Sequence, residues 1–139
     1  MRLALTTLCL SAASVACLGD SSVATIHLPD GRGTVSLRRE HAHVYLPEYR
    51  RSLTVELAGR PVITCDLPMD TGGTTRVALY QVAREAVIVR DRIGAYRAAS
   101  SGSCQEAEAI GDGVAPVGWF DEVDGRWIFV DAAKSTAGY

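Results

Sequence analysis

The chain has 139 residues, of which 47% are hydrophobic and 22% are charged, and its formal net charge at pH 7 is −2. This length predicts one domain with one core and excludes a multidomain array. The small net charge excludes the broadly basic surface by which many proteins bind nucleic acid. Residues 25–103 carry a net +3 and residues 104–139 carry −5. A mixed, solvated surface explains this asymmetry more simply than a surface that steers a partner.

The first residues have the pattern of an export signal. Arg2 precedes an apolar run that contains no charge before Asp20. Two copies of Ser-Val-Ala follow the pattern expected before a signal peptidase site, which predicts cleavage after Ala16 or after Ala24. The run is diluted by Ser and Thr and ends near Leu18, so it is shorter than the roughly 20 residues of a membrane-spanning helix.

Cleavage after Ala16 would leave Cys17 as the first residue. The sequence "SVAC" resembles the signal of bacterial lipoproteins, whose new amino-terminal cysteine is acylated, although Ser14 stands where that pattern usually has Leu. The resemblance implies a lipid on Cys17 and attachment to a membrane face; without it, the protein is expected free in the periplasm. The expected organisation is a leader with a short linker, one β domain and a flexible tail, at residues 1–24, 25–133 and 134–139.

Two cysteines remain after the leader and Cys17 are set aside. Cys9 lies in the leader, so Cys65 and Cys104 form an even pair in an oxidising compartment, which predicts a disulfide between them. Closing a loop of that length contributes about 4 kcal/mol in the chain-entropy model. The alternative is two buried free thiols. The absence of a C-x-x-C pair gives no support to a thioredoxin-like motif or a cysteine-rich zinc site.

Alternation of apolar and polar residues with a period of two dominates the chain, and helical periodicity is almost absent. Two short strands are expected around Pro29-Asp30-Gly31, where glycine supplies the positive φ of a turn. The next two apolar stretches form a hairpin signal, and three further stretches read as a meander. The hairpin and the meander cover residues 52–58, 61–67, 76–82, 85–91 and 93–98.

Residues 118–131 carry the clearest hairpin signal, because Asp124-Gly125 suits a type I′ turn. That turn places Phe120 opposite Phe129 and Glu122 opposite Trp127. Both faces of this hairpin are partly apolar, so it is expected to be central in its sheet or to meet another surface. The preceding residues 99–113 read as a loop with at most one helical turn, at the capping-box spacing of Ser103 and Glu106. The whole predicts about eight short antiparallel strands in a sandwich or a small barrel.

Asp70-Thr71-Gly72 is the tripeptide that carries the catalytic aspartate of aspartic proteases. The stretch "LAGRPVITCDLPMDTGG" resembles the strand and turn that lead to this aspartate in retroviral-type proteases. That resemblance implies a dimer in which two Asp70 carboxylates share one proton. Pro68 interrupts the apolar approach to the aspartate, and Gly73 replaces the usual small Ala or Ser. Asp, Thr and Gly are also turn-forming residues, and a turn is the interpretation we favour here.

His41 and His43 are two residues apart, so on a strand both imidazoles face the same side and could bind one metal ion. One or two more ligands would be needed, and nothing in the sequence brings them together. The simpler interpretation is a pair of exposed histidines, and no cofactor is expected. The sequence also lacks a P-loop, a G-x-G-x-x-G and a G-x-S-x-G motif, so no other catalytic class is favoured.

Aromatic and arginine residues cluster in "VYLPEYRR", where Tyr45, Tyr49, Arg50 and Arg51 are candidate contacts with a protein partner. The sequence therefore predicts an exported, disulfide-linked β domain that binds a protein and is not an enzyme. An inhibitor or immunity-type protein is the most concrete version of this function. The analogy with exported domains that block a toxin or a cell-wall hydrolase concerns only size and compartment. The two alternatives are the aspartic protease and a structural envelope lipoprotein.

Overall fold

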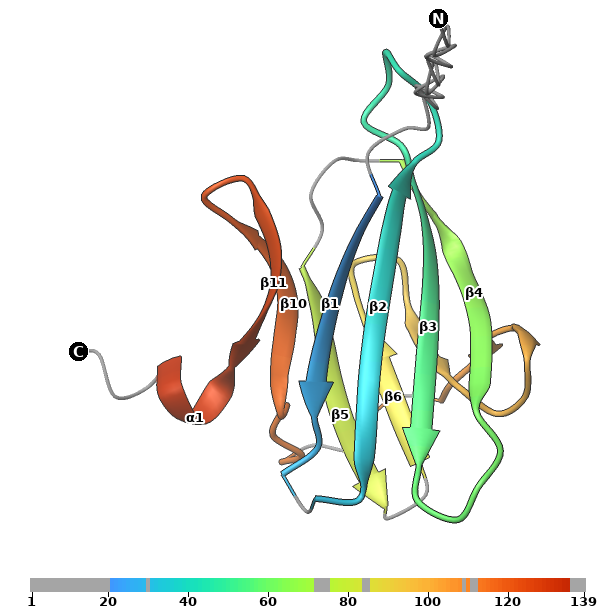
Figure 1. Ribbon diagram of the computed structural model, residues 1–139, viewed down its shortest axis with the longest axis vertical. Helices are drawn as coiled ribbons and strands as arrows, with labels where there is room; N and C mark the ends of the chain where they lie inside the picture. Colours follow the sequence, from blue (N-terminus) through green and yellow to red (C-terminus); the bar gives the residue numbers. More distant parts are fainter. Residues whose placement is uncertain are drawn as a thin grey trace, which may run out of the picture.

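The computed structural model describes residues 21–29, 31–71, 76–83, 86–108, 110 and 113–135. Within these residues, eleven strands form two sheets that pack face to face, and one short helix follows the last strand (Figure 1). This arrangement confirms the prediction of a single all-β domain, and it is a sandwich rather than a closed barrel. None of the described helical residues makes a helix long and apolar enough to cross a membrane.

Sheet A has five strands in the order β1-β2-β3-β4-β8. The first four pair antiparallel in chain order, as three successive hairpins, and β8 pairs with β4 in parallel. Their bounds are β1 Ser21–His27, β2 Gly33–His41, β3 Tyr49–Leu57, β4 Ile63–Asp70 and β8 Gly102–Ser103.

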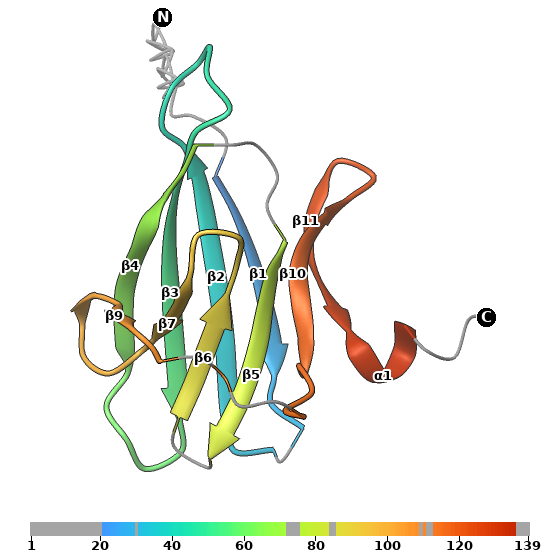
Figure 2. The ribbon, with the colours of Figure 1, turned by 180° about the vertical axis from the view of Figure 1, so that it is seen from behind.

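Sheet B has six strands in the order β11-β10-β5-β6-β7-β9, all antiparallel (Figure 2). The predicted meander is confirmed as β5, β6 and β7. The bounds are β5 Val77–Ala83, β6 Ala86–Arg90, β7 Ala95–Arg97, β9 Gln105–Glu106, β10 Gly118–Val123 and β11 Arg126–Asp131. Helix α1, Ala132–Ser135, follows β11 directly.

The core lies between the sheets and is built from alternate residues of the strands. In β2 and β3, Val35, Leu37, Leu53 and Val55 are 0–3% exposed, while the residues between them face away from the core. From sheet B, Phe120 is fully buried and packs edge-on against Phe129, with ring centroids 5.0 Å apart. Burial of one face of β2 and of β3 explains the period of two in their sequences.

The β10–β11 hairpin has the predicted register, with Phe120 opposite Phe129 and Glu122 opposite Trp127. Asp124 and Gly125 have φ values of 51° and 73°, as a type I′ turn requires. The hairpin is not central, however, because β11 is the edge strand of sheet B. Its outer apolar face is partly covered by Arg76, whose guanidinium lies 4.8 Å from the centre of the Trp119 ring.

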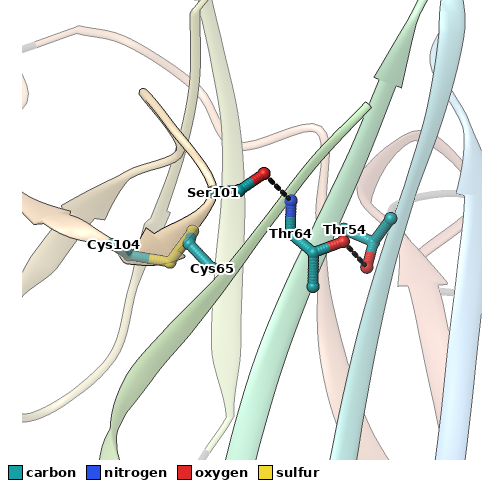
Figure 3. Close-up of a disulfide and its surroundings, with 5 residues drawn as sticks. All are labelled: Thr54, Thr64, Cys65, Ser101 and Cys104. Carbon is teal, nitrogen blue, oxygen red and sulfur yellow. Dashed lines mark hydrogen bonds between the residues drawn. A yellow bond between two sulfur atoms is a disulfide. The ribbon is translucent and has the colours of Figure 1, made fainter. Parts of the chain in front are cut away.

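The predicted disulfide between Cys65 and Cys104 is present, with a Cα–Cα distance of 4.9 Å (Figure 3). It links β4 of sheet A to the residue between β8 and β9, so it joins the two sheets at one side of the sandwich. The backbone N–H of Cys104 also donates to the carbonyl of Asp66, at 2.9 Å. The linkage therefore holds the otherwise weakly paired 99–108 segment against the core.

Three local predictions differ from the structure. Ser103 and Glu106 lie in the two-residue strands β8 and β9 rather than in a helical turn. The first described strand, β1, starts at Ser21, which is before the expected domain boundary at residue 25, and Ala24 is a core residue that is 6% exposed. Cleavage after Ala24 would remove half of β1, whereas cleavage after Ala16 would leave it whole. The first two residues of the expected tail lie in α1, and residues 136–139 fall outside the described part.

Candidate functional site

The loop between β2 and β3, residues 42–48, projects beyond the end of sheet A at which β1 begins (Figure 1). At its base, the N–H of Ala42 donates to the carbonyl of Glu48 at 2.8 Å, and the N–H of Glu48 donates to the carbonyl of Leu46 at 2.8 Å. His43 and Glu48 form an ion pair at 3.3 Å when the imidazole is protonated. These contacts close the loop on itself, so that its middle residues point into solvent.

Three consecutive apolar residues occupy the tip of this loop. Val44 is 88% exposed, Tyr45 is 94% exposed and Leu46 is 50% exposed. Single exposed apolar side chains are common on protein surfaces, but a contiguous group usually marks an interaction site. Tyr45, one of the predicted contact residues, is therefore accessible to a partner.

The loop rests on a buried arginine. The guanidinium of Arg39 lies 4.6 Å from the centre of the Tyr49 ring and 4.4 Å from that of Trp127, and it forms an ion pair with Glu122. Tyr49 also packs against His41, with ring centroids 4.3 Å apart. A nearly buried cation needs such partners, because its loss of hydration is otherwise uncompensated. The cluster holds the end of β2 and the start of β3, which the loop connects.

A cleft of about 400 Å³ opens beside this cluster, between the start of β1 and the tip of the β10–β11 hairpin. Both views show that this tip bends away from β1 (Figures 1 and 2). Polar and charged groups line most of the cleft. The lining residues are Ser21, Ser22, Arg39, His41, Tyr49, Glu122 and Gly125.

A second hollow, of about 420 Å³, lies on the outer face of sheet A. Its lining carries charges of both signs, together with one methionine. The positive residues are Arg38 and Arg50, the negative ones are Glu40 and Asp66, and the methionine is Met69. Arg50 is exposed and stands opposite Glu40 in the β2–β3 register. Of the predicted contact residues, Tyr49 and Arg50 thus lie beside two hollows at the base of the loop that carries Tyr45.

Arg51 has a different environment from its neighbour Arg50. Its side chain is 2% exposed and pairs with Asp91, which is 1% exposed, at 2.5 Å from Nη1 to Oδ2. Its Nη2 also donates to the carbonyl of Pro68 at 2.7 Å. The guanidinium therefore makes its contacts inside the domain, where it links sheet A to the turn between β6 and β7. We assign Arg51 a structural role, and Tyr45, Tyr49 and Arg50 stay candidate contact residues.

Asp91 and Tyr96 complete this buried cluster. The other carboxylate oxygen of Asp91 accepts the N–H groups of Ile93 and Gly94, at 2.7 and 3.0 Å, and so shapes the β6–β7 turn. Burial raises the pKa of Tyr96 above its usual value of 10, and the negative charges of Asp91 and Glu106 raise it further, while Arg51 opposes them. The phenol therefore stays neutral up to unusually alkaline pH.

Asp70, the candidate catalytic aspartate, ends β4 and is 3% exposed. Its carboxylate forms an ion pair with Arg92 of the β6–β7 turn, at 3.3 Å. An aspartic protease instead needs this carboxylate to share a proton with a second aspartate. Gly72 and Gly73 lie outside the described residues, so the turn interpretation of the rest of the motif stays a prediction.

The two candidate metal ligands face different neighbours. His41 packs against Tyr49, and His43 pairs with Glu48 in the loop. Within the described ranges, no group of three or more His, Cys, Asp or Glu side chains is placed to hold a metal ion. Cys17 lies outside these ranges.

Sequence reasoning missed Arg39, Glu122 and Asp91. A signal for Arg39 was present, because it alternates with Val35 and Leu37 on the buried face of β2. The pairing of Arg39 with Glu122 joins residues 83 positions apart, and only the packing of the two sheets brings them together. Comparison with family models, curated proteins and solved structures gives no match.

Proposed function

We propose that this protein is an exported binding module whose β2–β3 loop contacts a protein partner, most concretely as an inhibitor or immunity-type protein that blocks that partner. The observation that carries the proposal is the exposed sequence Val44-Tyr45-Leu46 at the tip of a loop that springs from two strands. Aromatic side chains on a well-supported loop are efficient anchors, because little conformational freedom is lost when they bind.

The base of the loop supports the same proposal. The strand ends are held in place by Arg39, Tyr49 and Glu122. The two hollows on either side offer polar groups for hydrogen bonds with the polar rim of a partner's surface. Interfaces commonly combine an apolar centre with a polar, partly hydrated rim. A projecting loop of this kind suits insertion into a cleft of the partner.

Export is supported by the leader pattern and is compatible with the Cys65–Cys104 disulfide. If Cys17 is acylated, the four residues from it to Ser21 span at most about 14 Å. Because β1 begins at the end of the sandwich that carries the loop, the loop would then work close to the membrane. Mass spectrometry of the mature amino terminus tests this part, and an unmodified first residue excludes the anchor.

Affinity capture with paired baits tests the proposal. The wild-type protein is expected to recover one stoichiometric protein from envelope and extracellular fractions, and the triple variant Val44→Ser, Tyr45→Ser, Leu46→Ser is expected to lose it. The matched control replaces three exposed valines elsewhere, Val62, Val82 and Val114, by Ser and should retain the partner. A partner held equally by the loop variant, or no partner in repeated captures, contradicts the proposal.

A further inference from the structure

A third pocket lies at the end of the sandwich opposite the β2–β3 loop. It has a volume of about 240 Å³ and opens between the two sheets, where β3 ends and where β4 and β6 begin (Figure 2). Its walls are largely apolar and extend outward from the core. Sheet A contributes Val55, Leu57 and Ile63 to them, and the sheet B side contributes Ala86, Val87 and Ala98.

Alanine explains why this part of the sandwich is not filled. Two packed sheets lie about 10 Å apart, and side chains from both inner faces normally fill the space between them. Here the sheet B side presents Ala86 and Ala98 to the branched side chains of sheet A. The methyl groups of these alanines are too short to fill that space, so an apolar gap remains.

Two arginines supply the only charges among the described residues that line this pocket. Arg60 lies in the turn between β3 and β4, Arg97 is the last residue of β7, and both are exposed. The two hollows beside the β2–β3 loop differ, because each of them contains carboxylates as well as guanidinium groups. An apolar pocket lined by cations and by no described carboxylate favours a ligand that has an apolar body and an anionic end.

We propose that this pocket binds a fatty acid, with the alkyl chain between the sheets and the carboxylate beside Arg60 and Arg97. The chain would replace water against the apolar walls, which is favourable for each CH₂ group that is buried. The exposed guanidinium groups would form charge-assisted hydrogen bonds with the carboxylate. The pocket and Tyr45 lie at opposite ends of the sandwich, so this site does not depend on the proposed function of the loop.

The volume of the pocket limits the ligand to one chain of medium length. A protein cavity of about 150 Å³ holds benzene, which has six carbon atoms. In proportion, about 240 Å³ has room for about nine or ten carbon atoms. Decanoate matches this length, whereas the two acyl chains of a phospholipid do not fit together in the pocket.

Calorimetric titration of the mature protein with decanoate tests the proposal. One decanoate is expected to bind per chain, with a Kd between about 10 and 500 µM. Octanoate lacks two CH₂ groups and should bind about 15-fold more weakly, because each buried CH₂ changes the affinity by about fourfold. Dihexanoyl phosphatidylglycerol, a soluble anionic lipid with two chains, should not displace decanoate.

Two variants test the charge and the space separately. Arg97→Glu should weaken decanoate binding by about tenfold, because the carboxylate then meets a like charge, and should leave the binding of uncharged decanol within about twofold. Ala86→Leu fills part of the pocket and should weaken the binding of both ligands. The control is Arg126→Glu, which makes the same charge change at an exposed arginine of the distant β10–β11 hairpin and should bind like the wild type.

Circular dichroism confirms that each variant is folded before the titration. A wild-type protein that binds no decanoate at about 1 mM overturns the proposal. If both variants bind decanoate as tightly as the wild type, the ligand lies elsewhere and this pocket is not its site. If Arg97→Glu weakens decanol as much as decanoate, the carboxylate does not lie beside Arg97. Displacement of decanoate by the phospholipid would contradict the limit to a single chain.

Discussion

In the β2–β3 loop, Val44 and Tyr45 are 88% and 94% exposed, whereas in the β6–β7 turn the carboxylate of Asp91 is 1% exposed. Each region reverses the usual placement of its residue types. The Asp91 carboxylate can be buried because it pairs with Arg51 and accepts hydrogen bonds from the N–H groups of Ile93 and Gly94. Its charge therefore contributes to the stability of the fold. No described residue covers the tip of the loop to a similar extent, so its apolar surface is exposed to solvent, as the proposed contact with a partner requires.

The comparison predicts that substitutions in the two regions affect different properties. Changes in the turn should lower the free energy of unfolding, because they leave a buried charge or donor without a partner. Changes at the loop tip should leave stability within about 0.5 kcal/mol of the wild type, because surface substitutions rarely do more. Their effect should fall on binding.

The largest expected effect on stability is that of Asp91→Asn. Asparagine keeps the acceptor for the turn but leaves the buried guanidinium of Arg51 without a counter-charge, which costs about 3–5 kcal/mol. Urea denaturation followed by circular dichroism measures the loss. The control Asp66→Asn changes an exposed carboxylate and should have little effect.

Adding Arg51→Met to Asp91→Asn should recover part of this stability, because the unpaired buried charge is then gone. If the double variant is no more stable than Asp91→Asn, the charge of Arg51 is not the cause of the loss. The role of the pair as a link between the two sheets would then need another explanation.

Glu122→Gln should have an intermediate effect, of about 1–3 kcal/mol, because Arg39 keeps its two aromatic neighbours but loses its anionic one. The neighbouring Asp121→Asn breaks a more exposed pair with Arg76 and should cost less than about 1 kcal/mol. Thermal unfolding of the two variants gives the comparison. Equal losses of stability would show that the more buried Arg39–Glu122 pair contributes no more to folding than the more exposed Arg76–Asp121 pair.

The smallest expected effect is a dependence on alkaline pH. Because the pKa of Tyr96 is raised in the folded protein, the unfolded chain releases this proton first. Tyr96 therefore contributes stability that is present below about pH 10 and is lost as the pH rises through its folded-state pKa. Tyr96→Phe should flatten the fall of unfolding free energy above pH 10, whereas Tyr45→Phe, at a tyrosine that is 94% exposed, should not. An unchanged slope in Tyr96→Phe would contradict this assignment.

Much of the fold was predictable because its signals are local. Alternation in residues 52–58 and the Asp124-Gly125 turn specify the strands and their registers without knowledge of the rest of the chain. The disulfide followed from the number of cysteines that remain after the leader. The position of the 118–131 hairpin at an edge did not follow, because strand order depends on how the two sheets pack.

The candidate site was predictable only in part. Tyr45 lies between two strand signals, in a segment that could be recognised as a loop. The difference between Arg50 and Arg51 also had a signal, since Arg51 alternates with Leu53 and Val55 on the buried face of β3. Its partner Asp91 is 40 residues away, and no local pattern indicates that contact.

Calorimetric titration of the captured partner with Tyr45→Ser tests the central claim most directly. Loss of a hot-spot aromatic residue typically costs at least about 2 kcal/mol of binding free energy, which corresponds to roughly a 30-fold weaker affinity at unchanged thermal stability. Val62→Ser should bind like the wild type. If Tyr45→Ser binds the partner as tightly as the wild-type protein does, the loop tip is not the contact surface and the account fails.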